Sequence, residues 1–225
     1  MDDNKSFVSQ NIRRILIVDD HPLVRTGLIS LVQNEADLEV CGETGMVSEA
    51  LELVGSEAPD LVIVDISLAD GNGLELVKRL LARNSELKVL VCSMHDEALF
   101  AHRALNAGAK GYINKQEATT QIIDAIRHVL KGKIWLSEPM TERVLQTLAT
   151  DSNGIQTTSI GCLSDRELEV FGLIGQGMGP KQIAEQLYLS VKTVETHRER
   201  IKKKLNLQSA GELVRCAVEW TLSQG

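Results

Sequence analysis

The sequence has few aromatic residues and no long hydrophobic run. Only 3% of its 225 residues are aromatic, and no apolar segment approaches the roughly 20 residues that a membrane-spanning helix needs. The first residues, Met1-Asp2-Asp3-Asn4-Lys5, lack the basic-then-apolar order of a secretory signal peptide. We therefore expect a cytoplasmic protein with no membrane partner.

Cysteine is also scarce, and the four cysteines lie far apart with no Cys-x-x-Cys spacing. This arrangement argues against a zinc site and against a disulfide framework, so we expect free thiols. They are Cys41, Cys92, Cys162 and Cys216. The segment Gly42-Glu43-Thr44-Gly45 lacks the third glycine of a dinucleotide-binding loop, which excludes that site as well.

The remaining composition fits two modest globular domains, because 43% of the residues are hydrophobic and 24% are charged. The net charge of −7 would seem to exclude nucleic acid as a partner, but the charge is unevenly distributed. Residues 191–204 alone hold six basic residues against two acidic ones. Such a local basic stripe on an acidic protein is compatible with nucleic-acid binding.

Two short apolar runs end in carboxylates. Leu61–Val64 precedes Asp65, and Ile15–Val18 precedes Asp19 and Asp20. Runs this short and this rich in Val and Ile predict strands buried on both faces of a parallel sheet, whose carboxyl ends meet at one edge. Three carboxylates gathered there repel one another unless a cation is present, and their oxygens suit Mg²⁺.

Two further apolar strands, Lys88–Ser93 and Gly111–Lys115, end in the hydroxyl of Ser93 and the ammonium of Lys115. Together with the acids they would form a phosphoryl-transfer site. Strands alternate with helical patterns here, which predicts an α/β doubly wound, five-stranded parallel sheet. Five strands and five helices account for this whole region.

Five residues in this order resemble the receiver domain of two-component response regulators, a flavodoxin-like fold. They are Asp19, Asp20, Asp65, Ser93 and Lys115. The resemblance covers residues 12–133. One departure is Ala69, four residues after Asp65, where the family usually has proline, so the loop is expected to be less rigid.

The resemblance implies a role for each residue. Asp65 would accept a phosphoryl group from a histidine kinase, and Lys115 would pair with that group. The ligands of Mg²⁺ would be Asp19, Asp20, Asp65 and the carbonyl of Ser67. Ser93 and Tyr112 match the hydroxyl and the aromatic residue whose coupled movement signals phosphorylation.

Residues 134–160 are predicted to be a linker, with a short helix to about Ala149 and a flexible tether over 150–159. Beyond it, a capping box starts at Ser164, Pro180 opens a second helix, and Ser190 is the expected N-cap of a third. A final helix follows Ser209. The pattern predicts a small all-α, four-helix domain of the helix-turn-helix type, whose basic third helix would enter the DNA major groove.

The segments Leu163–Glu167, Lys181–Ala184, Ser190–His197 and Ile201–Leu205 resemble the LuxR-type DNA-binding domain. The resemblance implies that Val194 and Ile201 face the core. It also implies that base edges are contacted by Glu195, Thr196 and Glu199. Phosphate contacts would come from Lys181, Lys192, His197, Arg198, Arg200 and Lys203.

A receiver at 12–133 followed by a LuxR-type domain at 161–225 resembles the NarL/FixJ family of response regulators. We expect a non-enzymatic transcription factor that binds paired promoter half-sites as a homodimer when it is phosphorylated. Two alternatives stay open. One is a phosphatase that uses Asp65 as its nucleophile, although Ser67 stands where such enzymes need an acid. The other is a regulator that no longer uses phosphorylation.

Overall fold

The computed structural model describes residues 12–95, 97–149 and 159–224. It forms two compact units. The first unit holds the residues up to Met94 together with Ala101–Leu136, and the second holds His95–Phe100 and the residues from Ser137 onward. Among the described helices, none has both the length and the apolar character that crossing a bilayer requires.

The first unit is built on a five-stranded parallel sheet in the order β2-β1-β3-β6-β7. The strands are β1 (Arg13–Val18), β2 (Leu38–Thr44), β3 (Leu61–Val64), β6 (Lys88–Ser93) and β7 (Gly111–Asn114). Every residue of β3 is buried, as expected for an apolar run at the centre of a parallel sheet. The predicted doubly wound sheet is therefore confirmed, and its strand order is flavodoxin-like.

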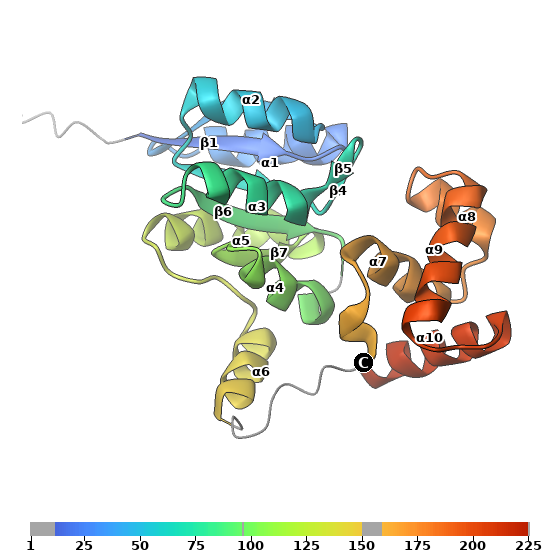
Figure 1. The fold of residues 1–225 in the computed structure, drawn as a ribbon. Helices are drawn as coiled ribbons and strands as arrows, with labels where there is room; N and C mark the ends of the chain where they lie inside the picture. Colours follow the sequence, from blue (N-terminus) through green and yellow to red (C-terminus); the bar gives the residue numbers. More distant parts are fainter. Residues whose placement is uncertain (1–11, 96, 150–158, 225) are drawn as a thin grey trace, which may run out of the picture. The chain divides into compact units, whose positions relative to one another are not determined.

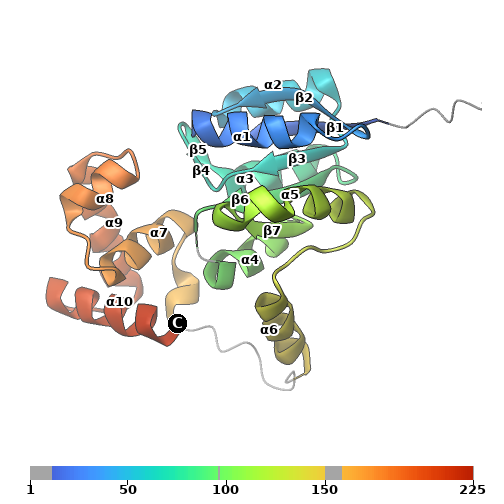
Figure 2. The ribbon, with the colours of Figure 1, turned by 180° about the vertical axis from the view of Figure 1, so that it is seen from behind.

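Five helices accompany the sheet. They are α1 (Pro22–Gln33), α2 (Val47–Glu57), α3 (Gly73–Arg83), α4 (Glu97–Asn106) and α5 (Lys115–Leu130). Helix α1 packs beside α5, and α2 packs beside α3. Figure 1 shows α2 and α3 in front of the sheet, and Figure 2, from behind, shows α1 and α5 in front of it. The sheet is thus covered on both faces.

The core beneath α1 and α5 follows the two-residue period of the strands. Ile15 and Ile17 of β1 and Leu61 and Ile63 of β3 share one buried cluster with apolar residues of α5 such as Ile126. Because alternate residues point to opposite faces, both faces of each central strand must be apolar. The uninterrupted Val, Ile and Leu runs meet this requirement.

One expectation for this unit is wrong. Five strands do not account for the region, because β4 (Ser67–Leu68) and β5 (Gly71–Asn72) form a small antiparallel hairpin between β3 and α3. Strands of two residues are too short to show an alternating pattern in the sequence. Gly73 follows the hairpin directly and begins α3. A Cβ atom at this position would lie only 1.9 Å from the carbonyl oxygen of Asp65.

The second unit is helical. Its elements are α6 (Glu138–Ala149), the 3₁₀ turn η1 (Ser159–Cys162), α7 (Asp165–Gly175), α8 (Pro180–Gln186), α9 (Val191–Lys204) and α10 (Ala210–Gln224). Helix α7 packs against α9 and α10, and α8 packs against α9. The four helices from α7 onward confirm the predicted all-α domain. The predicted tether lies outside the described residues except for Ser159, which begins η1.

The predicted helix starts in this unit are present. Ser164 and Glu167 form a reciprocal capping box on α7, and the Ser190 hydroxyl accepts a hydrogen bond from the Thr193 amide at the start of α9. Val194 and Ile201 are both fully buried, which places one face of α9 in the core. Helix α9 therefore leaves its charged face available for a partner.

Candidate functional site

Two buried carboxylates and a lysine meet at the carboxyl edge of the sheet. Val18 of β1 lies opposite Val64 of β3, so the residues that follow them, Asp19 and Asp65, come together. Each of these aspartates is only 2% exposed. The Nζ atom of Lys115, the first residue of α5, lies 2.6 Å from Asp19 Oδ2 and 2.7 Å from Asp65 Oδ2.

The charges of this group depend on one another. The pKa of Asp65 is raised to about 6, chiefly by burial; the Lys115 ammonium acts to lower it, and the Asp19 carboxylate acts to raise it. Burial acts to lower the pKa of Lys115, but the carboxylates of Asp65 and Asp19 hold it above its usual range. Lys115 is therefore a fixed cation between two acids.

Part of the carboxylate surface in this pocket has no hydrogen-bond donor. Asp65 Oδ1 and Asp20 Oδ1 are buried without a hydrogen-bond partner among the described residues. A buried carboxylate oxygen without a donor is costly unless a cation meets it. Ligand atoms of Asp19, Asp20, His21 and Asp65 all lie within 4.8 Å of one another, close enough to hold one metal ion. The residues thus fit a divalent cation.

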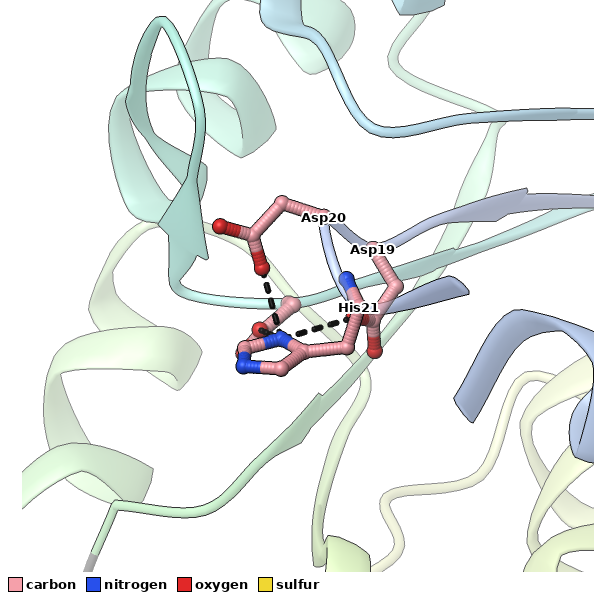
Figure 3. A group of neighbouring side chains, drawn as sticks. Asp19, Asp20 and His21 are labelled. Carbon is pink, nitrogen blue, oxygen red and sulfur yellow. Dashed lines mark hydrogen bonds and ion pairs between the residues drawn. The ribbon is translucent and has the colours of Figure 1, made fainter. Parts of the chain in front are cut away.

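The sequence predicted three of these four residues and missed His21. From the sequence, His21-Pro22 predicts a helix start, because proline suits the first helical turn; His21 is the N-cap residue of α1, followed by Pro22 at its first position. Its imidazole also enters the pocket: Nδ1 lies 2.6 Å from Asp20 Oδ1 and 3.3 Å from Asp19 Oδ1. Figure 3 shows this nitrogen turned toward both carboxylates. The signal was its position directly after two acids at a strand end.

The two predicted switch residues lie on neighbouring strands. Ser93 is the last residue of β6 and is buried, and a hydrogen bond from its side chain acts to lower the pKa of Asp65. Tyr112 of β7 is fully buried and lies two register positions away from Ser93, opposite Val91 of β6. Ser67 begins β4, two residues beyond Asp65.

Helix α9 and the preceding helix α8 form the second candidate site. Seven of the nine residues predicted to contact DNA are exposed. They are Lys181, Lys192, Glu195, Thr196, Glu199, Arg200 and Lys203. Both glutamates contact cations on the same helix, since Glu195 lies 3.5 Å from Arg198 and Glu199 lies 2.7 Å from Lys202. Helix α9 thus presents basic groups along one exposed face.

His197 and Arg198 differ from the other seven because they are only partly exposed. Burial lowers the pKa of His197, and the nearby cations of Arg166 and Arg200 lower it further. A histidine in this setting is neutral at neutral pH. Its electrostatic attraction for a phosphate is therefore weaker than that of the lysines and arginines around it.

Comparison with known families gives two matches in the order of the two units. The family described as "Response regulator receiver domain" matches residues 15–127, and "Bacterial regulatory proteins, luxR family" matches residues 161–217. The first match contains the acidic pocket with Lys115, and the second contains α8 and α9.

Relatives of known name match over nearly the full chain. The oxygen regulatory protein NreC of Staphylococcus carnosus is 36% identical over 210 residues, which is 92% of this chain and 97% of that protein. NreC of Staphylococcus aureus is 37% identical with the same coverage.

Solved structures show the same fold. A LuxR-family response regulator from Aurantimonas is 29% identical with a TM-score of 0.57 and covers 61% of this chain and 99% of its own. RcsB of Salmonella typhimurium, at 24% identity and a TM-score of 0.56, covers 91% of this chain and 97% of its own. With a receiver unit followed by a LuxR-type unit, and relatives that share both, the chain belongs to the NarL/FixJ family of two-component response regulators.

Proposed function

We propose that this response regulator is phosphorylated on Asp65 by a cognate histidine kinase, with Mg²⁺ as cofactor, and that phosphorylation controls its binding to promoter DNA. The observation that supports this most is the position of the Lys115 ammonium between the buried carboxylates of Asp19 and Asp65. A fixed cation beside a nucleophilic carboxylate suits the transfer of an anionic group.

In the proposed reaction a carboxylate oxygen of Asp65 attacks phosphorus in a phosphohistidine. An oxygen–phosphorus bond forms, and the phosphorus–nitrogen bond breaks with its electron pair on the histidine nitrogen. The unpartnered Oδ1 of Asp65 is free for this attack, while Oδ2 is held by Lys115. Lys115 then pairs with the oxygens of the transferred group.

Asp19, Asp20, Asp65 and the carbonyl of Ser67 are the proposed ligands of Mg²⁺. When bound, the ion neutralises charge on the phosphoryl oxygens. Two features support this ligand set. Asp19 and Asp65 are buried side by side, and one oxygen each of Asp20 and Asp65 has no hydrogen-bond donor among the described residues. Because those acids repel one another, the pocket gains stability from any cation that it takes up.

Phosphorylation adds roughly −1.5 to −2 charge units at Asp65. We propose that this charge draws the Ser93 hydroxyl toward the new phosphoryl oxygens and that Tyr112 follows. Both residues are buried on adjacent strands, β6 and β7, two register positions apart, which supports a coupled movement. The surface formed by α4, β7 and α5 would change with them.

The proposed DNA-binding residues lie along α8 and α9. Base edges would be contacted by Glu195, Thr196 and Glu199, and phosphates by Lys181, Lys192, His197, Arg198, Arg200 and Lys203. RcsB, which shares the fold, has been solved on promoter DNA with a phosphomimetic beryllium fluoride. We propose a homodimer on paired half-sites, assembled through α10, and a cytoplasmic location.

The proposed function divides the chain into two domains and a linker. Residues 12–133 are the proposed receiver, 134–160 the linker that holds α6, and 161–225 the DNA-binding domain. The family matches at 15–127 and 161–217 lie within the two proposed domains.

The test is phosphorylation with acetyl phosphate in the presence and absence of Mg²⁺, followed by phosphate-affinity electrophoresis. Wild type should be labelled only when Mg²⁺ is present. Asp65→Asn should not be labelled, whereas Asp60→Asn, a control on a carboxylate that instead bonds Arg13 and Arg14 at the sheet's other edge, should be labelled normally.

The same proteins are then titrated onto promoter DNA selected from random sequence, with fluorescence anisotropy as the readout. Phosphorylated wild type should bind more tightly than Asp65→Asn. If Asp65→Asn bound the DNA as tightly as phosphorylated wild type, control by phosphorylation would be wrong although DNA binding would stand.

A further inference from the structure

His21 is held at the mouth of the acidic pocket by its backbone. Its amide donates a hydrogen bond of 2.9 Å to Asp19 Oδ1, and its carbonyl accepts one of 3.1 Å from the Arg25 amide. Pro22 follows as the first residue of α1, with a ring that fixes its backbone φ angle. The direction of the imidazole relative to Asp19 and Asp20 is therefore set by the turn from β1 into α1.

The approach of the imidazole to the carboxylates is close but is not a hydrogen bond. Nδ1 lies 2.6 Å from Asp20 Oδ1, yet neither atom has a hydrogen-bond partner with acceptable alignment among the described residues. Two possible ligand atoms that converge in this way, without a hydrogen bond between them, have the arrangement of ligands around a common cation. Figure 3 shows Nδ1 at the point where the carboxylates converge.

The distances also fit a single ion. Nδ1 is 2.6 Å from Asp20 Oδ1, 3.3 Å from Asp19 Oδ1 and 3.9 Å from Asp65 Oδ2. For an octahedral ion with bonds of about 2.1 Å, neighbouring ligand atoms are about 3.0 Å apart and opposite ones about 4.2 Å apart. The three separations lie near or between these values, so small shifts would bring the nitrogen and the oxygens onto one metal.

Lys115 does not occupy this position. Its Nζ contacts the Oδ2 atoms of Asp19 and Asp65, whereas His21 Nδ1 lies nearest the Oδ1 atoms of Asp20 and Asp19. Asp65 Oδ2 faces both groups, at 2.7 Å from Lys115 Nζ and 3.9 Å from His21 Nδ1. A metal ion can therefore meet the Oδ1 atoms beside His21 while the lysine keeps its contacts with the Oδ2 atoms.

We propose that His21 is a metal ligand in this pocket and makes it selective for first-row transition ions such as Mn²⁺, Co²⁺ and Ni²⁺ over Mg²⁺. Imidazole nitrogen binds these ions well, whereas Mg²⁺ prefers oxygen ligands and gives up its water reluctantly. This inference rests on the proposed metal-dependent function of the same pocket. It adds that the chain responds to which divalent ion is available.

The test uses full-length protein without a polyhistidine tag. Pulsed electron paramagnetic resonance of bound Mn²⁺ reports a directly coordinated imidazole through the magnetic coupling of its ¹⁴N nucleus. Wild type should show this coupling and His21→Ala should lose it. His102→Ala, which removes an exposed histidine on α4, is the matched control and should retain the coupling.

Calorimetric titration gives the second readout. Loss of a residue that only supports a metal ligand weakens metal binding by about 10–100-fold. His21→Ala removes a ligand itself, so Ni²⁺ binding should weaken by at least this factor. Mg²⁺ binding should change little. Circular dichroism and urea unfolding of His21→Ala check that the variant is folded.

Two results would overturn the proposal: ¹⁴N coupling that persists in His21→Ala, or an equal loss of Ni²⁺ and Mg²⁺ affinity in that variant. If wild type is phosphorylated with Mg²⁺ but its bound Mn²⁺ shows no imidazole coupling, only the role of His21 fails. If wild type binds no divalent ion at all, the proposed metal-dependent function fails as well.

Discussion

Asp70 caps a helix that begins more than twenty residues before it in the sequence: its Oδ1 atom accepts a hydrogen bond of 2.5 Å from the Val47 amide. Its Oδ2 atom accepts two more, from the amide and the hydroxyl of Ser48. The N-cap residue of α2, Met46, offers no side-chain hydrogen bond of its own. Asp70 lies between β4 and β5, so the segment that follows the proposed phosphoacceptor is tied to α2.

Loss of this cap should destabilise the first unit. Asp70→Ala is expected to lower the free energy of unfolding by about 0.5–2 kcal/mol, the usual cost of losing an N-cap side chain. Glu52→Ala, which removes an exposed acid of α2, should change it by less than about 0.5 kcal/mol. Urea denaturation followed by circular dichroism measures both. Equal effects of the two substitutions would show that the cap contributes nothing specific.

These contacts also explain how far the sequence could predict the fold. Apolar runs such as Leu61–Val64 identify strands because each residue's neighbours in the sheet are equally apolar. Caps such as Ser164 and Ser190 are visible because their partners lie three residues away. Both signals are local, and the structure confirms them.

The features that the sequence did not predict depend on contacts between distant segments. The hairpin of β4 and β5 and the bond from Asp70 to Val47 leave no periodic pattern. The expectation that Ala69 would loosen this loop considered the missing proline alone, whereas the loop has three hydrogen bonds from α2. His21 was predicted as a helix start, and only its distances to Asp19 and Asp20 place it in the pocket.

Removal of Lys115 should destabilise the folded protein, and a bound metal ion should restore part of the lost stability. In Lys115→Met, the carboxylates of Asp19 and Asp65 lose the ammonium that contacts both. Leaving a buried charge without its partner costs about 3–5 kcal/mol. We expect a loss of this size without Mg²⁺ and a smaller loss with it, because the ion restores positive charge.

Thermal and urea unfolding with and without Mg²⁺ measure this difference. Lys78→Met is the control, since Lys78 forms an exposed ion pair with Glu75 that is worth at most about 1 kcal/mol. An Mg²⁺ effect of the same size in Lys115→Met and in Lys78→Met would contradict an ion site beside Lys115.

Glu167 should make the stability of the second unit depend on pH. Burial acts to raise the pKa of Glu167, but hydrogen bonds from Lys204 Nζ at 2.6 Å and from the Ser164 amide at 2.8 Å hold it below its ordinary value of 4.5. The unfolded chain therefore takes up this proton at a higher pH than the folded chain. The stabilisation is complete above pH 4.5 and is lost as the pH falls through the lower pKa of the folded state.

Glu167→Gln should remove about 1.5–3 kcal/mol at neutral pH, the contribution of hydrogen bonds to a charged group, and should make the loss of stability in acid less steep. Glu185→Gln, at an exposed position of α8, should change neither the free energy of unfolding at neutral pH nor its fall in acid. Urea unfolding from pH 3 to pH 7 can follow the fluorescence of Trp220 in a Trp135→Phe background, since Trp220 packs on Phe171 in this unit. If the free energy of unfolding fell as steeply in acid for Glu167→Gln as for wild type, Glu167 would not be the group responsible.

The exposed face of α9 predicts two kinds of effect on DNA binding. Arg200 is an exposed cation, and Arg200→Ala should weaken binding to all sequences alike and reduce the slope of log K against log salt by about 0.9, the value for one phosphate contact. Glu195 is proposed to accept a hydrogen bond from a cytosine. Glu195→Ala should therefore relax the base preference at one position, by about 1–3 kcal/mol of discrimination, with little change in the salt slope.

Anisotropy titrations over a range of salt concentrations, on the selected operator and on single-base variants, separate the two effects. Lys133→Ala removes an exposed cation of the first unit and should leave both quantities unchanged. If Glu195→Ala lost affinity equally for every base variant, Glu195 would act through its contact with Arg198, which lies 3.5 Å away on the same helix, and not through a base. The salt slope distinguishes that case, because a displaced Arg198 would also remove a phosphate contact.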